Sequence, residues 1–145
     1  RANQILRGVD QMGVFGFFKK RKSELSREQK KWNKMWDLWA ENRADTPYAE
    51  VMTYQSEVNN GGHDQYFLNV EQTGDLQAEI SILENVLSEE LRSNLLTAYD
   101  AYQMLADKES DEEWEAILER CDDVFFKNEE EINRILKAYA AKIEL

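Results

Sequence analysis

The chain has 145 residues, 42% of them hydrophobic and 11% aromatic, so it can bury the core of one domain but hardly of two. Its formal net charge of −11 disfavours nucleic acid and anionic membranes as direct ligands of the body of the protein, because phosphates would be repelled. A basic partner is favoured instead. One cysteine and one histidine are too few for a zinc site of the usual ligand types, and no metal or other cofactor is expected.

The single cysteine, Cys121, excludes an internal disulfide, and it falls within an apolar stripe typical of a small core residue rather than a nucleophile. No apolar run is long enough for a membrane-spanning helix or a secretion signal. These features favour a reducing, cytoplasmic location.

Charge is distributed unevenly along the sequence. Residues 1–43 contain 11 Lys/Arg against 5 Asp/Glu, whereas residues 44–145 contain 7 against 24. We predict a basic, Phe-containing tail over residues 1–25 and an acidic all-helical domain over residues 26–145. In the tail, MGVFGFF precedes KKRK, which could touch a membrane surface weakly or dock its phenylalanines in a groove of this chain or a neighbour. Docking is the favoured interpretation.

The body is predicted to be almost entirely helical, because proline occurs once and apolar residues recur at spacings of three and four. The first helix starts at Ser26, which forms a capping box with Gln29. The second starts at an N-cap, Thr46, with Pro47 at its first helical position, and NNGG ends it. Their apolar stripes are Trp32, Met35, Trp36 and Trp39 in the first, and Val51, Tyr54 and Val58 in the second.

Five further helices are predicted downstream. A short one closes at Gly74, the next covers DLQAEISILENVL, and another starts at Ser88. Two capping boxes, Ser110 with Glu113 and Asn128 with Glu131, open the last two. The stripes are Tyr66, Phe67 and Val70; Leu76, Ile80, Leu83 and Leu87; Leu91, Leu95, Tyr99, Tyr102 and Leu105; Trp114, Leu118, Cys121 and Phe125; Ile132, Ile135, Leu136, Tyr139 and Ile143. The fold class is therefore an all-α, single-domain bundle of about six to seven helices without strands.

The stretch SEVNNGGHDQYFLN, residues 56–69, contains the only histidine and the only adjacent glycines. In a structural interpretation, residues 59–62 take left-handed conformations that end one helix, and Asp64 caps the next. In a catalytic interpretation, His63 is a general base oriented by Asp64 or Glu57. Adjacent residues rarely point at a common reacting atom, and no Ser or Cys nucleophile has a suitable context, so the structural interpretation is favoured and no catalytic residue is assigned.

The same stretch resembles the signature of the DMP-nineteen-like family of small bacterial domains, which runs roughly E-x-x-N-G-G-F-x-Q-Y-F-x-N. The likeness covers about residues 30–143 and includes DDVFF before the last helix. His63 stands where the family pattern has an aromatic residue. The matching residues are Glu57, Asn60, Gly61, Gly62, Gln65, Tyr66, Phe67 and Asn69.

This resemblance implies an all-helical fold. The family is best known for acidic members that imitate DNA on the surface of a DNA-binding protein, often as dimers. The resemblance therefore raises DNA mimicry and a homodimer as expectations for this chain.

Acidic residues on the helix predicted from Ser110 recur at spacings of three, four and three, which makes one row about 15 Å long at ~1.5 Å per residue. Neighbours in it lie ~5–6 Å apart, whereas one DNA strand presents a charge every ~3.4 Å. A second row is therefore needed, from Glu89, Glu90 and Asp100, from Glu129–Glu131, or from a dimer partner. The predicted partner-binding face comprises Glu112, Glu115, Glu119, Asp122, Glu129 and Glu130.

Part of this acidity is ordinary, because carboxylates in the first turn of a helix are stabilised by the helix dipole. The scarcity of lysine and arginine on the same helices is not explained in that way. We therefore predict a non-enzymatic domain that binds a basic DNA-binding protein and blocks its access to DNA.

Two alternatives stay open. The first is an immunity or antitoxin-type inhibitor of a basic nuclease toxin, whose binding resists salt if Phe126 is buried at the contact. The second is a small-ligand-binding protein or hydrolytic enzyme centred on EVNNGGHDQYF. Substitution of His63 by phenylalanine distinguishes these classes, because a structural corner should tolerate it and a catalytic base would not.

Overall fold

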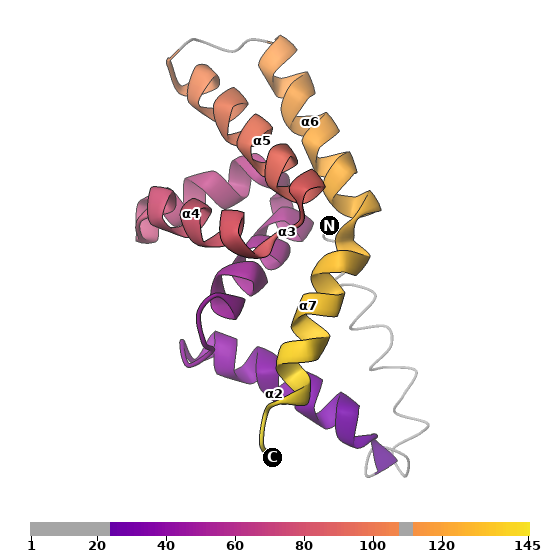
Figure 1. Cartoon of the computed structure of the whole chain (residues 1–145). Coiled ribbons are helices and arrows are strands. Elements are labelled where there is room, and N and C mark those ends of the chain that lie inside the picture. The colour runs from indigo at the N-terminus through magenta and orange to yellow at the C-terminus, as the bar shows by residue number, and fades with distance from the viewer. Residues whose placement is uncertain (1–23, 108–111) are drawn as a thin grey trace, which may run out of the picture. The chain divides into compact units, whose positions relative to one another are not determined.

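A computed structural model describes residues 24–107 and 112–145, so the predicted tail lies outside them except for Glu24 and Leu25, as does Ser110. The described residues form six helices and no strand (Figure 1). The predicted all-α bundle of six to seven helices is confirmed. The helices are α2 (Arg27–Ala40), α3 (Tyr48–Thr73), α4 (Leu76–Val86), α5 (Glu89–Asp107), α6 (Glu112–Lys127) and α7 (Glu129–Ala141).

The chain divides into two compact units. Unit 1 comprises Arg1–Ala44 and Lys137–Leu145, and unit 2 comprises Asp45–Leu136. By sequence, unit 1 carries 13 Lys/Arg against 6 Asp/Glu and unit 2 carries 5 against 23, which together account for all 18 basic and 29 acidic residues. The acidity of the protein is therefore a property of unit 2.

Helix α2 of unit 1 has well-formed ends. The Ser26 hydroxyl accepts a hydrogen bond from the Gln29 backbone N–H at 3.0 Å, which is the N-cap half of the predicted capping box, while the Gln29 amide donates to Asn33 at 2.9 Å. At the other end Asn42 takes a left-handed conformation with φ 59°, and the Arg43 N–H bonds back to the Leu38 carbonyl at 2.7 Å. This is a Schellman-type ending with asparagine in place of the usual glycine.

Helix α3 differs from the prediction in its N-cap and in the conformation of NNGG. Its N-cap is Pro47 rather than Thr46, whose hydroxyl bonds to the Glu50 carboxylate instead. NNGG ends the first part of α3 as predicted: the backbone leaves helical geometry at Gly62, so the 26-residue α3 consists of two helices that meet there at a kink. Of the four residues predicted to be left-handed, only Gly62 has a positive φ, at 86°.

The core of unit 2 is built around α3, which contacts α4, α5 and α6. Helices α5 and α6 pack side by side in opposite directions and are joined through residues 108–111 (Figure 1). The predicted stripe of α5 is buried at Leu91 and Leu95 but only half-buried at Tyr99, Tyr102 and Leu105. The end of this stripe therefore reaches the surface. Fully buried side chains of unit 2 include Met52, Tyr54, Tyr66, Phe67, Leu83, Leu91, Leu95, Phe125, Ile132 and Leu136.

The ends of α5 and α7 show why capping is hard to assign from sequence. Ser88 caps α5 as predicted, accepting from the Leu91 N–H at 3.3 Å. The Asn128–Glu131 capping box is wrong: the Asn128 amide donates to the Val124 carbonyl, and the Glu131 carboxylate accepts from the Ser88 N–H at 3.1 Å. A partner from another helix has replaced the local one.

Candidate functional site

His63 lies at the α3 kink with no exposed surface, and both of its ring nitrogens have partners. Its Nε2 lies 2.7 Å from the Tyr54 hydroxyl, and its Nδ1 lies 2.7 Å from Oδ1 of Asp122 on α6. Because a carboxylate can only accept, Nδ1 carries a proton, and we assign Tyr54 as the donor to Nε2. Burial, followed by the nearby Tyr66, Cys121 and Asp122, raises the pKa of Tyr54 well above its ordinary value, which keeps this donor protonated.

Asp122 also holds the backbone at the kink. Its Oδ1 accepts from the His63 backbone N–H at 2.9 Å, a group that the kink leaves without a partner in its own helix. The predicted cap, Asp64, is exposed, and within the described residues its carboxylate accepts from the N–H of the next residue, Gln65. The cap at the kink thus comes from another helix. An Asp–His–hydroxyl chain resembles a catalytic relay in its order, but His63 is inaccessible and both nitrogens are occupied, so it can reach no substrate in this conformation.

Asp122 therefore does not belong to the acidic face, which corrects the prediction. Its side chain is only 14% exposed and points at His63. At 100° per residue, the position opposite the core stripe of α6 is Asp123, which is exposed. The exposed row on α6 consists of Glu112, Glu115, Glu119 and Asp123. Phe126, 38% exposed, lies one turn beyond Asp123.

The carboxylates of the first turn of α7 are only partly available for a second row. Glu129 accepts from the Gln55 amide at 3.0 Å and from the Asn59 amide at 2.6 Å. Glu131 is held by the Ser88 N–H. These two carboxylates fasten α7 to other helices of unit 2, whereas Glu130 is exposed.

Comparison with known proteins agrees with the motif. Residues 41–143 match the family described as DMP19-like protein. The chain belongs to the DMP19-like family. No curated protein and no solved structure matches the chain.

The DMP19-like signature divides into an inward and an outward set in this fold. Gly62, Tyr66 and Phe67 are buried with His63 at the kink. Outside, the Asn69 amide donates to the Glu57 carboxylate across the kink, twelve residues away, and so braces the two halves of α3.

The two glycines of the signature are required for different physical reasons. Gly62 adopts φ 86° and ψ −179°, a conformation that essentially only glycine takes. Gly61 is needed for space, because a Cβ there would lie 2.8 Å from Cβ of Gln65 and closer still to its amide. The contacts of the signature thus support a structural role for the corner.

Two buried groups near the corner have shifted acidities. Burial, and next the negative Asp122, raise the pKa of the Cys121 thiol to about 11, which keeps it protonated at neutral pH. The Tyr66 hydroxyl is buried without a hydrogen-bond partner among the described residues, and its pKa is raised by burial and then by Glu79 and Glu50. Neither group has the features of a nucleophile.

A groove of about 700 Å³ follows the outward side of the corner. It lies between the second half of α3 and the last turns of α5. Its lining residues are Gly61, Asp64, Gln65, Leu68, Asn69, Tyr102, Leu105 and Ala106.

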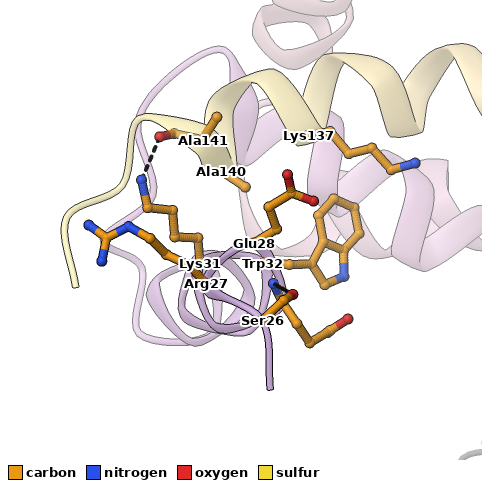
Figure 2. A pocket seen from close by; sticks show the side chains of 9 residues that line it. Ser26, Arg27, Glu28, Lys31, Trp32, Lys137, Ala140 and Ala141 are labelled. Carbon is orange, nitrogen blue, oxygen red and sulfur yellow. Dashed lines mark hydrogen bonds between the residues drawn. The ribbon is translucent and has the colours of Figure 1, made fainter. Parts of the chain in front are cut away.

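Unit 1 has a hollow of its own, about 770 Å³, between the start of α2 and the end of α7 (Figure 2). Its lining includes three cations, Arg27, Lys31 and Lys137, as well as Trp32 and the carboxylate of Glu28. The Lys31 amine donates to the Ala141 carbonyl at 2.8 Å, which gives this lysine a role at the C-terminal end of α7.

Neither a metal-binding cluster nor a membrane-spanning helix is found in the described part of the chain. Residues 24–107 and 112–145 contain no group of three or more His, Cys, Asp or Glu side chains placed to hold a metal ion. Within the same ranges, no helix is long and apolar enough to cross a membrane.

Proposed function

We propose that the protein binds a basic DNA-binding protein through unit 2 and thereby blocks that protein's access to DNA. The observation that carries the proposal is the exposed row of Glu112, Glu115, Glu119 and Asp123 on a single face of α6. At ~1.5 Å per residue the row is roughly 16 Å long. Membership of the DMP19-like family gives the fold that presents it.

The charge balance of unit 2 supports attraction of a cationic surface. Its 23 acidic and 5 basic residues produce a negative field that raises the association rate of a basic partner. A single row has roughly half the charge density of one DNA strand, since its carboxylates are ~5–6 Å apart. Full mimicry of DNA therefore needs further carboxylates, from the exposed Glu89, Glu90 and Glu130 or from a second copy.

The test is capture of partners from a lysate of the source cells on the immobilised full chain. We expect a DNA-binding protein that is retained at low salt, released at high salt and displaced by added DNA. A variant with Glu115→Lys, Glu119→Lys and Asp123→Lys should no longer retain this DNA-binding protein.

The matched control changes the same net charge elsewhere. Glu28, Asp37 and Glu144 are exposed residues of unit 1, and their substitution by lysine should leave the partner bound. Equal retention by both variants would mean that the α6 row is not the contact surface.

A second candidate is an inhibitor of a basic nuclease toxin, of the immunity-protein type. The exposed Phe126, at the end of the row, favours it, because a buried aromatic anchor gives affinity that salt does not screen. In the same capture experiment, this function would give one partner that survives high salt and is lost on Phe126→Ser.

A further inference from the structure

The groove along the outward side of α3 exposes apolar surface that the fold leaves uncovered. Leu68 projects from α3 with 46% of its surface exposed, and Tyr102 and Leu105 are only half-buried. The latter two continue the buried stripe of α5 past Leu95. An apolar stripe that runs into a groove, rather than ending at a polar residue, is typical of a surface that binds another chain.

The polar groups of the groove indicate the charge of what it binds. Asp64 lines it and is exposed, and no lysine or arginine is among its lining residues. Two more carboxylates lie at its edges: Glu57, which is bonded to Asn69, and Glu71, which accepts from the Tyr102 hydroxyl at 3.3 Å. A cation is therefore favoured over an anion beside the apolar surface.

Amide side chains complete the lining. Gln65 and Asn69 follow one another at a spacing of four on the same face of α3. Such groups can both donate and accept, which suits the alternating N–H and C=O groups of a polypeptide.

We propose that this groove binds a segment of the basic partner, in which an apolar side chain contacts Leu68, Tyr102 and Leu105 and an adjacent arginine or lysine pairs with Asp64. The inference rests on the proposed function, to which it adds an apolar anchor. It gives the interface a component that does not depend on charge.

One end of the groove and one end of the acidic row lie at the same end of the α5–α6 pair. Leu105 and Ala106 lie in the last turn of α5, and Glu112 lies in the first turn of α6. Because α5 and α6 are antiparallel neighbours joined through residues 108–111, these turns lie at the same end of the pair (Figure 1). A partner that follows the row to this end would reach the helix turns that border the groove.

The experiment uses the full chain and two synthetic peptides, one with a single leucine between arginines and one with serine in its place. Affinities are measured by isothermal titration calorimetry on the wild type and on Leu68→Ser. Leu96→Ser is the matched control, since Leu96 is 39% exposed on α5 and does not line the groove. We expect the leucine peptide to bind the wild type and Leu96→Ser about tenfold more tightly than the serine peptide, and Leu68→Ser to bind both alike.

Two kinds of result would contradict the groove as a binding site. Equal affinities of the two peptides for the wild type, or no binding of either, would overturn the groove as a binding site. Equal effects of Leu68→Ser and Leu96→Ser would do the same.

The variant with lysine at residues 115, 119 and 123 separates the two proposals. If this variant binds both peptides as tightly as the wild type, and so keeps the preference for leucine, the result contradicts the acidic row as a contact surface and supports the groove. If the variant binds both peptides with lower affinity and the wild type shows no preference between them, the result supports the acidic row and contradicts the groove.

Discussion

His63 illustrates how a residue type suited to catalysis can be used for structure. It is buried at the α3 kink, and it connects Tyr54 of its own helix to Asp122 of α6 through both ring nitrogens. The same Asp122 oxygen also accepts from the His63 backbone N–H. The Asp122 carboxylate thereby holds the backbone at the kink, sets the tautomer of the His63 imidazole and ties α6 to α3.

The sequence alone suggested that a structural corner tolerates His63→Phe, but the two hydrogen-bond partners of the buried ring lead us to expect a loss of stability. A phenylalanine ring at this position could not pair with the Tyr54 hydroxyl, and an unpaired buried hydroxyl costs about 1–3 kcal/mol. In urea denaturation, His63→Phe should therefore lower the free energy of unfolding by about that amount. Adding Tyr54→Phe should recover part of the loss, because the unpaired group is then removed. Equal stability of wild type and His63→Phe would show that the network contributes nothing.

At the scale of elements, the kink in α3 is the feature that shapes unit 2. It turns one 26-residue helix into two segments, of which the second carries Tyr66, Phe67 and Val70 into the core. The bond between Asn69 and Glu57 and the contact between Gly61 and Gln65 close the outer side of the bend. Gly62 alone supplies the backbone conformation that the bend requires.

A pair of glycine substitutions tests the kink. Gly62→Ala should destabilise the protein by about 1–3 kcal/mol, because alanine is strained at φ 86°, ψ −179°. Gly74→Ala is the control: Gly74 has an extended φ of −163°, and the nearest atom to an added Cβ is 3.7 Å away. Its free energy of unfolding should stay within about 0.5 kcal/mol of the wild type. Similar losses in both variants would argue against strain at Gly62 as the cause.

At the scale of the whole molecule, charge separates along the division into units. Unit 2, with 23 acidic against 5 basic residues, carries all of the excess acidity, while unit 1, with 13 basic against 6 acidic residues, is net basic. Self-repulsion in the acidic unit lowers its stability, and the same field is what would attract a basic partner. The field that would serve the proposed binding function therefore has a cost in the stability of unit 2.

The expected consequence is a thermal stability that rises with salt. Between low and moderate ionic strength the Debye length falls from ~30 Å to ~8 Å, which screens repulsion among the 23 acidic residues of unit 2. The Tm measured by circular dichroism should increase over this range. The rise should be smaller in the variant with lysine at residues 115, 119 and 123. A Tm that falls with added salt would show that favourable ion pairs, not repulsion, dominate.

Local sequence was enough to predict the all-helical fold, most helix positions, the family and the acidity. These depend on the spacing of apolar residues, on caps such as Ser26 and Ser88, and on composition, all of which act within a few residues. It also indicated that the corner around His63 is structural, which its contacts support.

Packing between distant segments was needed to establish which acidic residues face outward and what holds the corner. Asp122 and Asp123 are neighbours in sequence, yet one caps a kink 59 residues away and the other continues the exposed row. Likewise NNGG indicated the end of a helix, but not that the next helix would begin at once with its His63 N–H bonded to Asp122 of another helix. Hydrogen bonds between distant segments depend on how helices pack, and no local pattern specifies them.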